Sequence, residues 1–157
     1  MADIIVQKFG GTSVGSDERI SAVAQIIKNA KKDNQVIVVV SAMSGETNRL
    51  INLAKSFGDN PDRREFDALI STGEKVSASL LAMALNSIGV KAKSFSASQI
   101  SMKTTDHHSK AKIIDVNGEK ILSTLNDDIV PIITGFQGVT ESGDVTTLGR
   151  GLSLIHI

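Results

Sequence analysis

The sequence predicts an α/β fold, a three-layer α/β/α sandwich with a mainly parallel sheet at its centre. Two observations carry this prediction. Runs rich in Ile and Val at Ile4–Phe9, Val36–Val40 and Ile129–Thr134 have the apolar character of strands that are covered on both faces. Segments with helical periodicity separate these runs, and helices that connect parallel strands cover both faces of such a sheet.

The first quarter of the chain reads as strand, helix and strand. After the strand Ile4–Phe9, a helix is expected over Asp17–Lys32, because its apolar residues recur every three or four positions. Ser16 or Asp17 can cap this helix. The strand Val36–Val40 then runs parallel to the first, and the connection is expected to be a right-handed crossover.

Further helices and short strands complete the prediction. The helices are expected over Thr47–Ser56, Pro61–Ser71 and Glu74–Ile88. The remaining elements are strands at Lys91–Ser96 and Ile113–Val116, a helix over Asn117–Asn126, the strand Ile129–Thr134, and a hairpin over Phe136–Thr147 that turns at Ser142-Gly143.

Composition limits the classes of function. The chain has 157 residues, of which 41% are hydrophobic, and this suits one domain with a sizeable core. Lys plus Arg and Asp plus Glu both total 17, so no net charge attracts nucleic acid or a membrane surface. The chain has no cysteine, and no segment approaches ~18 uninterrupted apolar residues. These observations predict a cytoplasmic protein without nucleic-acid or membrane partners.

The motif KFGGTSVG, which directly follows the first strand, has the character of a phosphate-binding loop. Its two glycines let backbone N–H groups approach a phosphate, and the lysine before them neutralises charge. No G-x-x-x-x-G-K-[ST] pattern occurs, so the loop is not of the Walker type. Ser41 follows the second strand at its carboxyl end, where ligands of open parallel sheets bind. The predicted cofactor-binding residues are Lys8, Gly10, Gly11, Thr12, Ser13 and Ser41.

Three further motifs follow at characteristic positions: VVVSAMSGETN up to Asn48, STGEKVSA from Ser71, and PIITGFQGVTESGDVTTLGRG from Pro131 to Gly151. In this order and spacing, the four motifs resemble the amino-acid kinase superfamily and, within it, the aspartate kinases. The resemblance covers about residues 3 to 151.

The resemblance implies a specific reaction. It is the ATP-dependent phosphorylation of the side-chain carboxylate of L-aspartate to 4-phospho-L-aspartate, the first step of lysine, threonine and methionine synthesis, with ATP and Mg²⁺ as cofactors. Lys8 is the implied catalytic residue, because its ammonium would neutralise charge on the transferring phosphoryl group. No side chain is assigned to a metal, and full-length members are expected to be homo-oligomers. The implied aspartate-binding residues are Thr47, Glu74, Arg150 and Ser153.

Simpler structural roles are open for several of these residues. Lys8 could be the charged end of an edge strand, and Thr12 and Ser13 could cap the first helix. Thr47 could cap the helix that it precedes, and Glu74 could do the same for its own helix. For the reaction, the alternatives are another amino-acid kinase or a non-catalytic fragment that binds a ligand or a partner subunit.

The family pattern breaks at Leu152. Aspartate kinases continue with glycine, serine and aspartate, whereas this chain reads Leu152, Ser153 and Leu154. We therefore expect residues 1–151 to be the N-terminal part of an amino-acid kinase domain, C-terminally truncated, and residues 152–157 to be an apolar tail outside the family. Leucine cannot replace the aspartate that orients phosphoryl transfer, so this chain by itself is expected to be inactive.

The polar segment Lys103–Lys112 is expected to be solvated surface. His107 and His108 are adjacent and cannot share a helix face, so a solvated loop is favoured over a metal site. Asp144 is expected to be a turn former.

Overall fold

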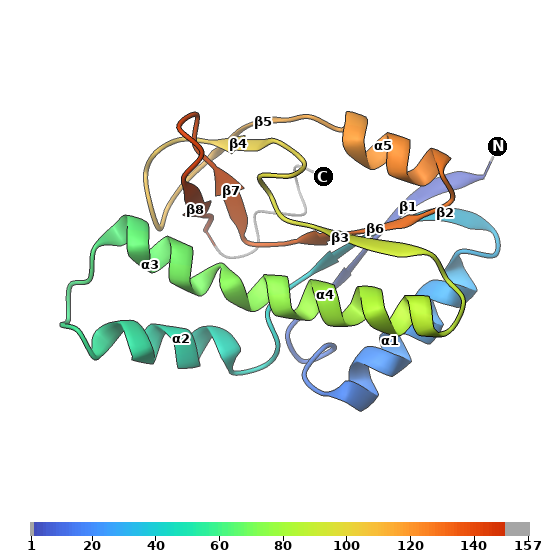
Figure 1. Cartoon of the computed structure of the whole chain (residues 1–157), viewed down its shortest axis with the longest axis horizontal. Coiled ribbons are helices and arrows are strands. Elements are labelled where there is room, and N and C mark those ends of the chain that lie inside the picture. The colour runs from blue at the N-terminus through green and yellow to red at the C-terminus, as the bar shows by residue number, and fades with distance from the viewer. Residues whose placement is uncertain (1, 150–157) are drawn as a thin grey trace.

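The structure is a computed structural model that describes residues 2–149. Its elements follow the predicted alternation of strands and helices (Figure 1). In chain order they are β1 (Asp3–Phe9), α1 (Asp17–Ala30), β2 (Asn34–Val40), α2 (Glu46–Lys55), α3 (Arg63–Ile70), α4 (Thr72–Ser87), β3 (Ala92–Phe95), β4 (Met102–Thr104), β5 (Ile113–Val116), α5 (Glu119–Asn126), β6 (Val130–Thr134), β7 (Gln137–Val139) and β8 (Val145–Thr147).

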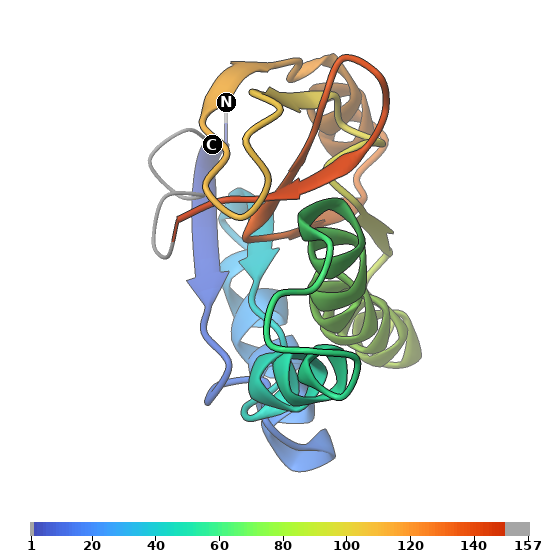
Figure 2. The ribbon, with the colours of Figure 1, turned by 90° about the vertical axis from the view of Figure 1, so that its left-hand side faces the viewer.

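The main sheet has four parallel strands in the order β1-β2-β6-β3. Helices α1 and α4 cover one face, and α5 covers the other, as Figures 1 and 2 show from two directions. The predicted three-layer α/β/α sandwich is therefore confirmed. Because the strands are parallel, Phe9, Val40 and Thr134 all lie at one edge of the sheet, and the loops that leave this edge converge.

The two faces of β2 carry separate cores. Val36, Val38 and Val40 face α1 and α4, while Ile37 and Val39 face α5. This alternation explains why the run is apolar at every position, since both faces are covered. Major partners on the first side are Ile20, Val23, Ile27, Leu81 and Leu85; those on the second side are Phe95, Ile121 and Leu125.

A second sheet, with the order β5-β4-β7-β8, packs beside the end of α3. The predicted hairpin forms: β7 and β8 are antiparallel, and Gly143 takes φ +90° in the turn. The expectation of solvated surface over Lys103–Lys112 is wrong at its start, because β4 ends at Thr104 and pairs with both β5 and β7. Thr104 is buried there, and its hydroxyl lies 2.6 Å from that of Thr146.

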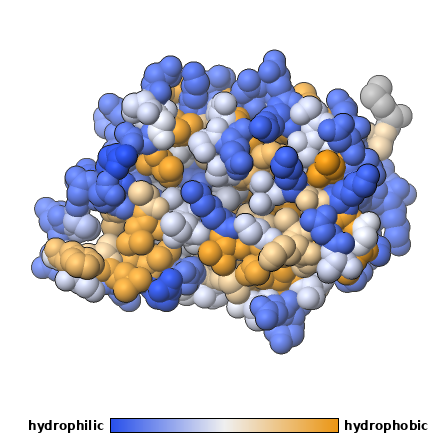
Figure 3. Space-filling model, viewed as in Figure 1, coloured by the Kyte–Doolittle hydropathy of each residue, from blue (hydrophilic) through white to orange (hydrophobic). Residues whose placement is uncertain are grey.

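Helices α3 and α4 follow one another with Ser71 between them, so Thr72-Gly73 does not form the loop that their predicted bounds implied. The helical stretch Arg63–Ser87 is long and apolar enough to cross a bilayer by length and composition. Half of its most apolar 18 residues are nevertheless buried inside the fold. Partial burial of this kind is typical of a helix in a protein core. On the outside, Leu53 and Phe57 are exposed on α2 and the turn after it, and apolar side chains gather over that corner of Figure 3.

Candidate functional site

The loops after β1 and β2 are in direct contact at the carboxyl edge of the main sheet. The N–H of Ser41 donates to the carbonyl of Phe9 at 3.0 Å, and that of Ser44 donates to the carbonyl of Gly11 at 3.1 Å. A Cβ on Gly11 would lie 2.8 Å from the carbonyl oxygen of Ala42. Residue 11 is therefore glycine because the two loops approach too closely for a side chain.

The first turn of α4 packs against the same loop. A Cβ on Gly73 would lie 2.9 Å from the Cβ of Ala42, so glycine allows the helix to approach. The Ser77 hydroxyl donates to the carbonyl of Ser41 at 2.7 Å. The N–H of Ala42 in turn donates to Oε1 of Glu74 at 3.3 Å. These contacts join the motifs at Ser41 and Ser71 into one site.

Glu74 is a buried acid with unused hydrogen-bonding capacity. It is 2% exposed, and its Oε2 has no partner among the described residues. Burial raises the pKa of Glu74 to about 7, against the opposing effect of the backbone N–H groups of Glu74 and Ala42. Because its side chain reaches out of the helix to Ala42, a cap-only role does not describe it. A buried acceptor without a partner favours a cationic or donating ligand.

The KFGGTSVG loop has polar groups available for an anion. The N–H of Ser13 closes a turn onto the carbonyl of Gly10, at 3.0 Å. The N–H groups of Gly10, Gly11 and Thr12 make no backbone hydrogen bond to any other group in residues 2–149. Ser16 caps α1 by accepting from the N–H of Arg19, so the alternative capping role of Thr12 and Ser13 is wrong.

Lys8 is the last residue but one of β1, on the face opposite Phe9 and beside Val39 in the register. Its side chain is exposed, and no described acid pairs with it. Within residues 2–149, β1 is also an edge strand, so both interpretations of Lys8 fit its position. An unpaired ammonium at this edge can reach an anionic ligand.

Thr47 does not cap a helix. The N-cap of α2 is Gly45, at φ +81°, and Thr47 lies inside the first turn. Its hydroxyl is half-buried and makes no hydrogen bond to another described residue. The capping alternative is therefore wrong, and the role in aspartate binding stays a prediction. Arg150 and Ser153 lie outside the described residues, and so does the tail after Gly151.

The segment that leads to Arg150 is held at the same edge. The N–H of Gly135 donates to the carbonyl of Val40 at 2.9 Å, and the N–H of Leu148 donates to that of Phe136 at 2.8 Å. Phe136 has φ +65°, which is strained for a bulky residue. Such strain clusters at functional sites, and no residue type in the sequence signalled it.

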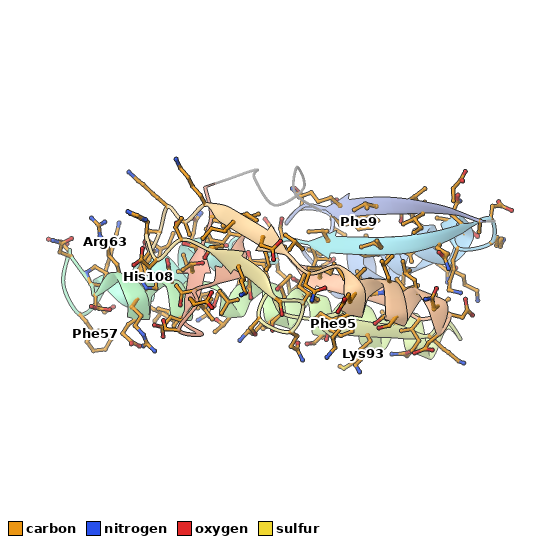
Figure 4. All side chains as sticks on the ribbon, turned by 90° about the horizontal axis from the view of Figure 1, so that it is seen from above. Phe9, Phe57, Arg63, Lys93, Phe95 and His108 are labelled. Atoms are coloured by element: carbon orange, nitrogen blue, oxygen red, sulfur yellow. The ribbon has the colours of Figure 1, made fainter. Side chains whose placement is uncertain are left out.

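The sequence analysis also missed Asp67, which is fully buried in α3. Nδ1 of His108 lies 3.0 Å from its Oδ2, so the expected solvated loop is wrong for His108. Figure 4 shows His108 at the α3 end of the molecule. His107 is exposed, as expected. One signal was present: Asp67 lies three residues before Ile70, on the inward face of its helix.

Asp144 follows the predicted turn and has a second role. It pairs with Arg64 of α3, at 2.7 Å between Arg64 Nη2 and Asp144 Oδ1. This guanidinium lowers the pKa of Asp144.

No group of three or more His, Asp or Glu within residues 2–149 could hold a metal ion. Mg²⁺ is usually bound by one or two carboxylates together with nucleotide phosphates.

The fold and this edge define a parallel α/β domain with a candidate small-molecule site at the carboxyl ends of its strands. The chain belongs to the amino acid kinase family, whose model matches residues 3–153. It is 51% identical over 149 residues to the aspartokinase of Geobacillus stearothermophilus and 53% identical over 151 residues to an aspartate kinase of Pseudomonas fluorescens. Both matches cover 94% of this chain and 37% of the relative, so the chain spans little more than a third of their length.

Solved structures agree with this assignment. The aspartate kinase of Synechocystis superposes with a TM-score of 0.78 at 44% identity, over 97% of this chain and 25% of that one. Aspartokinase III of E. coli, in complex with aspartate and ADP, gives a TM-score of 0.85 at 25% identity, over 96% of this chain and 44% of that one. The predicted resemblance to aspartate kinases and the predicted fold are confirmed.

Proposed function

We propose that the protein to which this segment belongs is an aspartate kinase that transfers the γ-phosphoryl group of ATP to the side-chain carboxylate of L-aspartate. The observation that carries the proposal is the buried Glu74, whose Oε2 lacks a partner within residues 2–149 at the edge where the four motifs meet. An α-ammonium group is the natural ligand for this oxygen. The similarity to relatives named for this activity supports the choice of substrate.

In the proposed mechanism, the protein positions the aspartate carboxylate in line with the γ-phosphoryl group and neutralises the charge on that group. It forms no covalent intermediate. An oxygen of the aspartate side chain attacks the γ-phosphorus. The bond from that phosphorus to the bridging oxygen breaks, and ADP leaves with the electron pair. Glu74 binds the α-ammonium, Thr47, Ser153 and Arg150 bind the rest of the amino acid, and Lys8 neutralises charge on the phosphoryl group. The N–H groups of the Gly10-Gly11 loop and the hydroxyl of Ser41 would bind phosphate oxygens.

We further propose that the 157-residue chain by itself does not catalyse this reaction. They span little more than a third of the relatives, and Leu154 stands where the family pattern has an aspartate. Losing one charge-positioning group at such a site costs about 10²- to 10³-fold in rate. A cytoplasmic location and homo-oligomeric assembly are likewise expected for the whole protein. The alternative is another amino-acid kinase or a non-catalytic fragment.

The test uses a chimaera, called here the completed enzyme, in which residues 1–151 replace the matching segment of the Geobacillus stearothermophilus aspartokinase. Acyl phosphate is trapped with hydroxylamine for aspartate, glutamate, acetylglutamate and carbamate as acceptors. We expect product with aspartate and at least a hundredfold less with the others, and no product from the 157-residue chain. A different preferred acceptor would contradict the proposed substrate.

A further inference from the structure

We propose that the carboxyl ends of β3 and β6 form, with α4, a second binding site that takes a small oxyanion, a phosphate or a carboxylate. The site is a cavity of about 240 Å³, and its polar lining includes Lys75, Ser79, Ser94, Gln99 and Thr134. Among residues 2–149, neither Glu74 nor the KFGGTSVG loop lines it. The inference therefore goes beyond the proposed function and does not depend on it.

The polar side chains of the two strands face α4 because side chains alternate along a strand. Ile132 of β6 belongs to the core that faces α1 and α4, so Thr134, two residues further, lies on the same face. Ser94 pairs with Ile132 in the register and shares that face. Lys75 and Ser79 lie one turn apart on α4, which runs alongside both strands (Figure 1). Three elements thus direct polar groups into one space.

Thr134 supplies the observation that points to a ligand. It is 2% exposed, and its Oγ1 has no hydrogen-bond partner within residues 2–149. Most buried polar groups in folded proteins are paired, because an unpaired one is destabilising. Valine has the same shape and would end this buried strand without that cost. The hydroxyl therefore indicates that a group in the cavity hydrogen-bonds to it.

The other polar groups of the cavity are available donors. The N–H and the hydroxyl of Ser96 donate to Oε1 of Gln99 at 2.9 and 3.2 Å, so the NH₂ group of Gln99 is left to bind something else. Lys75 forms no ion pair with another described residue. No described Asp or Glu lines the cavity, so its formal charge is positive.

These groups suit a small oxyanion. An ammonium, an NH₂ group and hydroxyls can surround a phosphate or a carboxylate, whose charged oxygens accept hydrogen bonds. A cation would meet Lys75 without an acid to bind it. The cavity is smaller than the pockets of about 300–1,000 Å³ that hold drug-sized ligands, so a single ion or a short metabolite fits better than a nucleotide. Ligands of open parallel sheets bind at this edge.

The test is a titration of the ¹⁵N-labelled 157-residue chain with sodium phosphate and sodium acetate, followed by amide chemical shifts. Sodium chloride controls for ionic strength. We expect saturable shifts over residues 75–79 and 94–99 with a Kd below about 10 mM, and none with chloride. The anion that binds more tightly identifies the source of the oxyanion. The completed enzyme serves for the same titration if the chain does not fold alone.

Lysine variants separate this cavity from other charged surface. Lys75→Gln should weaken binding about tenfold or more, because it removes a charge-assisted hydrogen bond. The matched control is Lys93→Gln, which removes the same charge from the opposite face of β3, where Lys93 lies over the ring of Phe95 (Figure 4). This control should leave the Kd within about twofold. Lys8→Ala should weaken phosphate binding at Gly10 and leave the cavity unchanged.

Thr134→Val distinguishes a ligand contact from a structural one. In buffer without phosphate or carboxylate, its Tm should rise by about 2 °C or more, because a buried hydroxyl without a partner has been removed. Its affinity for the anion should fall about threefold or more. A structural hydroxyl would give a lower Tm instead.

The inference is overturned if neither anion shifts the cavity amides beyond the chloride control, since the cavity would then hold only water. Equal losses in Lys75→Gln and Lys93→Gln would also overturn it, because binding would then follow surface charge alone. A lower Tm in Thr134→Val would do the same. None of these measurements uses enzyme activity, so a failure of the proposed function in its own test would leave this site standing.

Discussion

At the scale of single residues, Glu74 combines a structural cost with the proposed substrate contact. Its carboxylate is 2% exposed, and one of its oxygens has no partner in the part of the chain that the structure describes. Burial makes this environment unfavourable for the ionised form and raises the pKa of Glu74 to about 7. Groups of this kind are retained where a ligand compensates them. The cost and the function can be separated because they respond differently to pH.

The first prediction concerns substrate binding. Only the ionised form of Glu74 attracts an ammonium group, so kcat/KM for aspartate should fall about tenfold per pH unit below about 7. In Glu74→Gln, this pH dependence should be absent. The measurement is kcat/KM of both proteins from pH 5.5 to 8.5. The same slope in both would assign the titration to another group.

The second prediction concerns stability. Because the folded state binds the Glu74 proton more tightly than the unfolded state does, stability should fall as pH rises from 4.5 to about 7, and stay reduced above that. The contribution is on the order of 3 kcal/mol at full ionisation. Glu74→Gln should therefore melt at a higher temperature than the parent at pH 8, but not at pH 4.5. Thermal melts of the 157-residue chain test this, and a destabilised variant at pH 8 would contradict it.

The third prediction concerns Lys8. Its side chain is exposed and pairs with no described acid, so Lys8→Ala should leave the thermal midpoint within about 1 °C. In the completed enzyme, the same change should lower kcat by about 10²-fold or more, with a smaller change in the KM for aspartate. Arg150→Ala should show the reverse pattern. An exchange of these two patterns would mean that the roles are reversed.

At the scale of elements, the two loops that form the site are held together by close backbone approach. The sequence predicts a phosphate-binding loop at Gly10 and Gly11. It does not show which of the two positions requires glycine. The structure does, because a Cβ at Gly10 meets nothing within 4 Å, while one at Gly11 meets the carbonyl oxygen of Ala42 at 2.8 Å. That distinction depends on a residue 31 positions away and could not be predicted from the motif.

The fourth prediction follows from this difference. Gly11→Ala should destabilise the chain by about 1–3 kcal/mol, because backbone must move to admit the methyl group. Gly10→Ala should change stability by less than about 0.5 kcal/mol or raise it slightly, because it removes freedom from the unfolded chain. Urea unfolding of both variants makes the comparison. Equal losses would mean that the loops do not approach as closely as described.

At the scale of the whole molecule, local patterns predicted the main sheet, the helices and the β7–β8 hairpin, and missed β4 and the network around Asp67. The runs at β1, β2 and β6 and the periodicity of α1 and α4 are visible within short windows, and these elements form as expected. β4 has three residues and is defined by pairing with β5 and β7, so no local signal identifies it. The Asp67 network joins residues 41 and 80 positions away, which a single sequence does not reveal.

In the site, too, features set by local sequence were predicted, and features set by contacts between distant residues were not. The motif after the second strand predicted that Ser41 lies at the carboxyl edge of the sheet, and its contact with the first turn of α4 became visible only in the structure. Two capping alternatives failed for geometric reasons, because Ser16 caps α1 and Gly45 is the N-cap of α2. Glu74 accepts from its own N–H in the first turn of α4 and also from that of Ala42, so capping is not its only contact. The cap of α2 lies two residues before Thr47, and sequence patterns do not fix helix bounds so finely.

The central claim is that this edge binds the amino-acid substrate of an aspartate kinase through Glu74. The most direct measurement is the KM for aspartate of Glu74→Gln in the completed enzyme at pH 8, beside that of the parent. Removing one charge-assisted hydrogen bond of roughly 1.5–3 kcal/mol should raise the KM about ten- to a hundredfold, while the KM for ATP stays the same. An unchanged KM for aspartate in a folded, active variant would contradict the account.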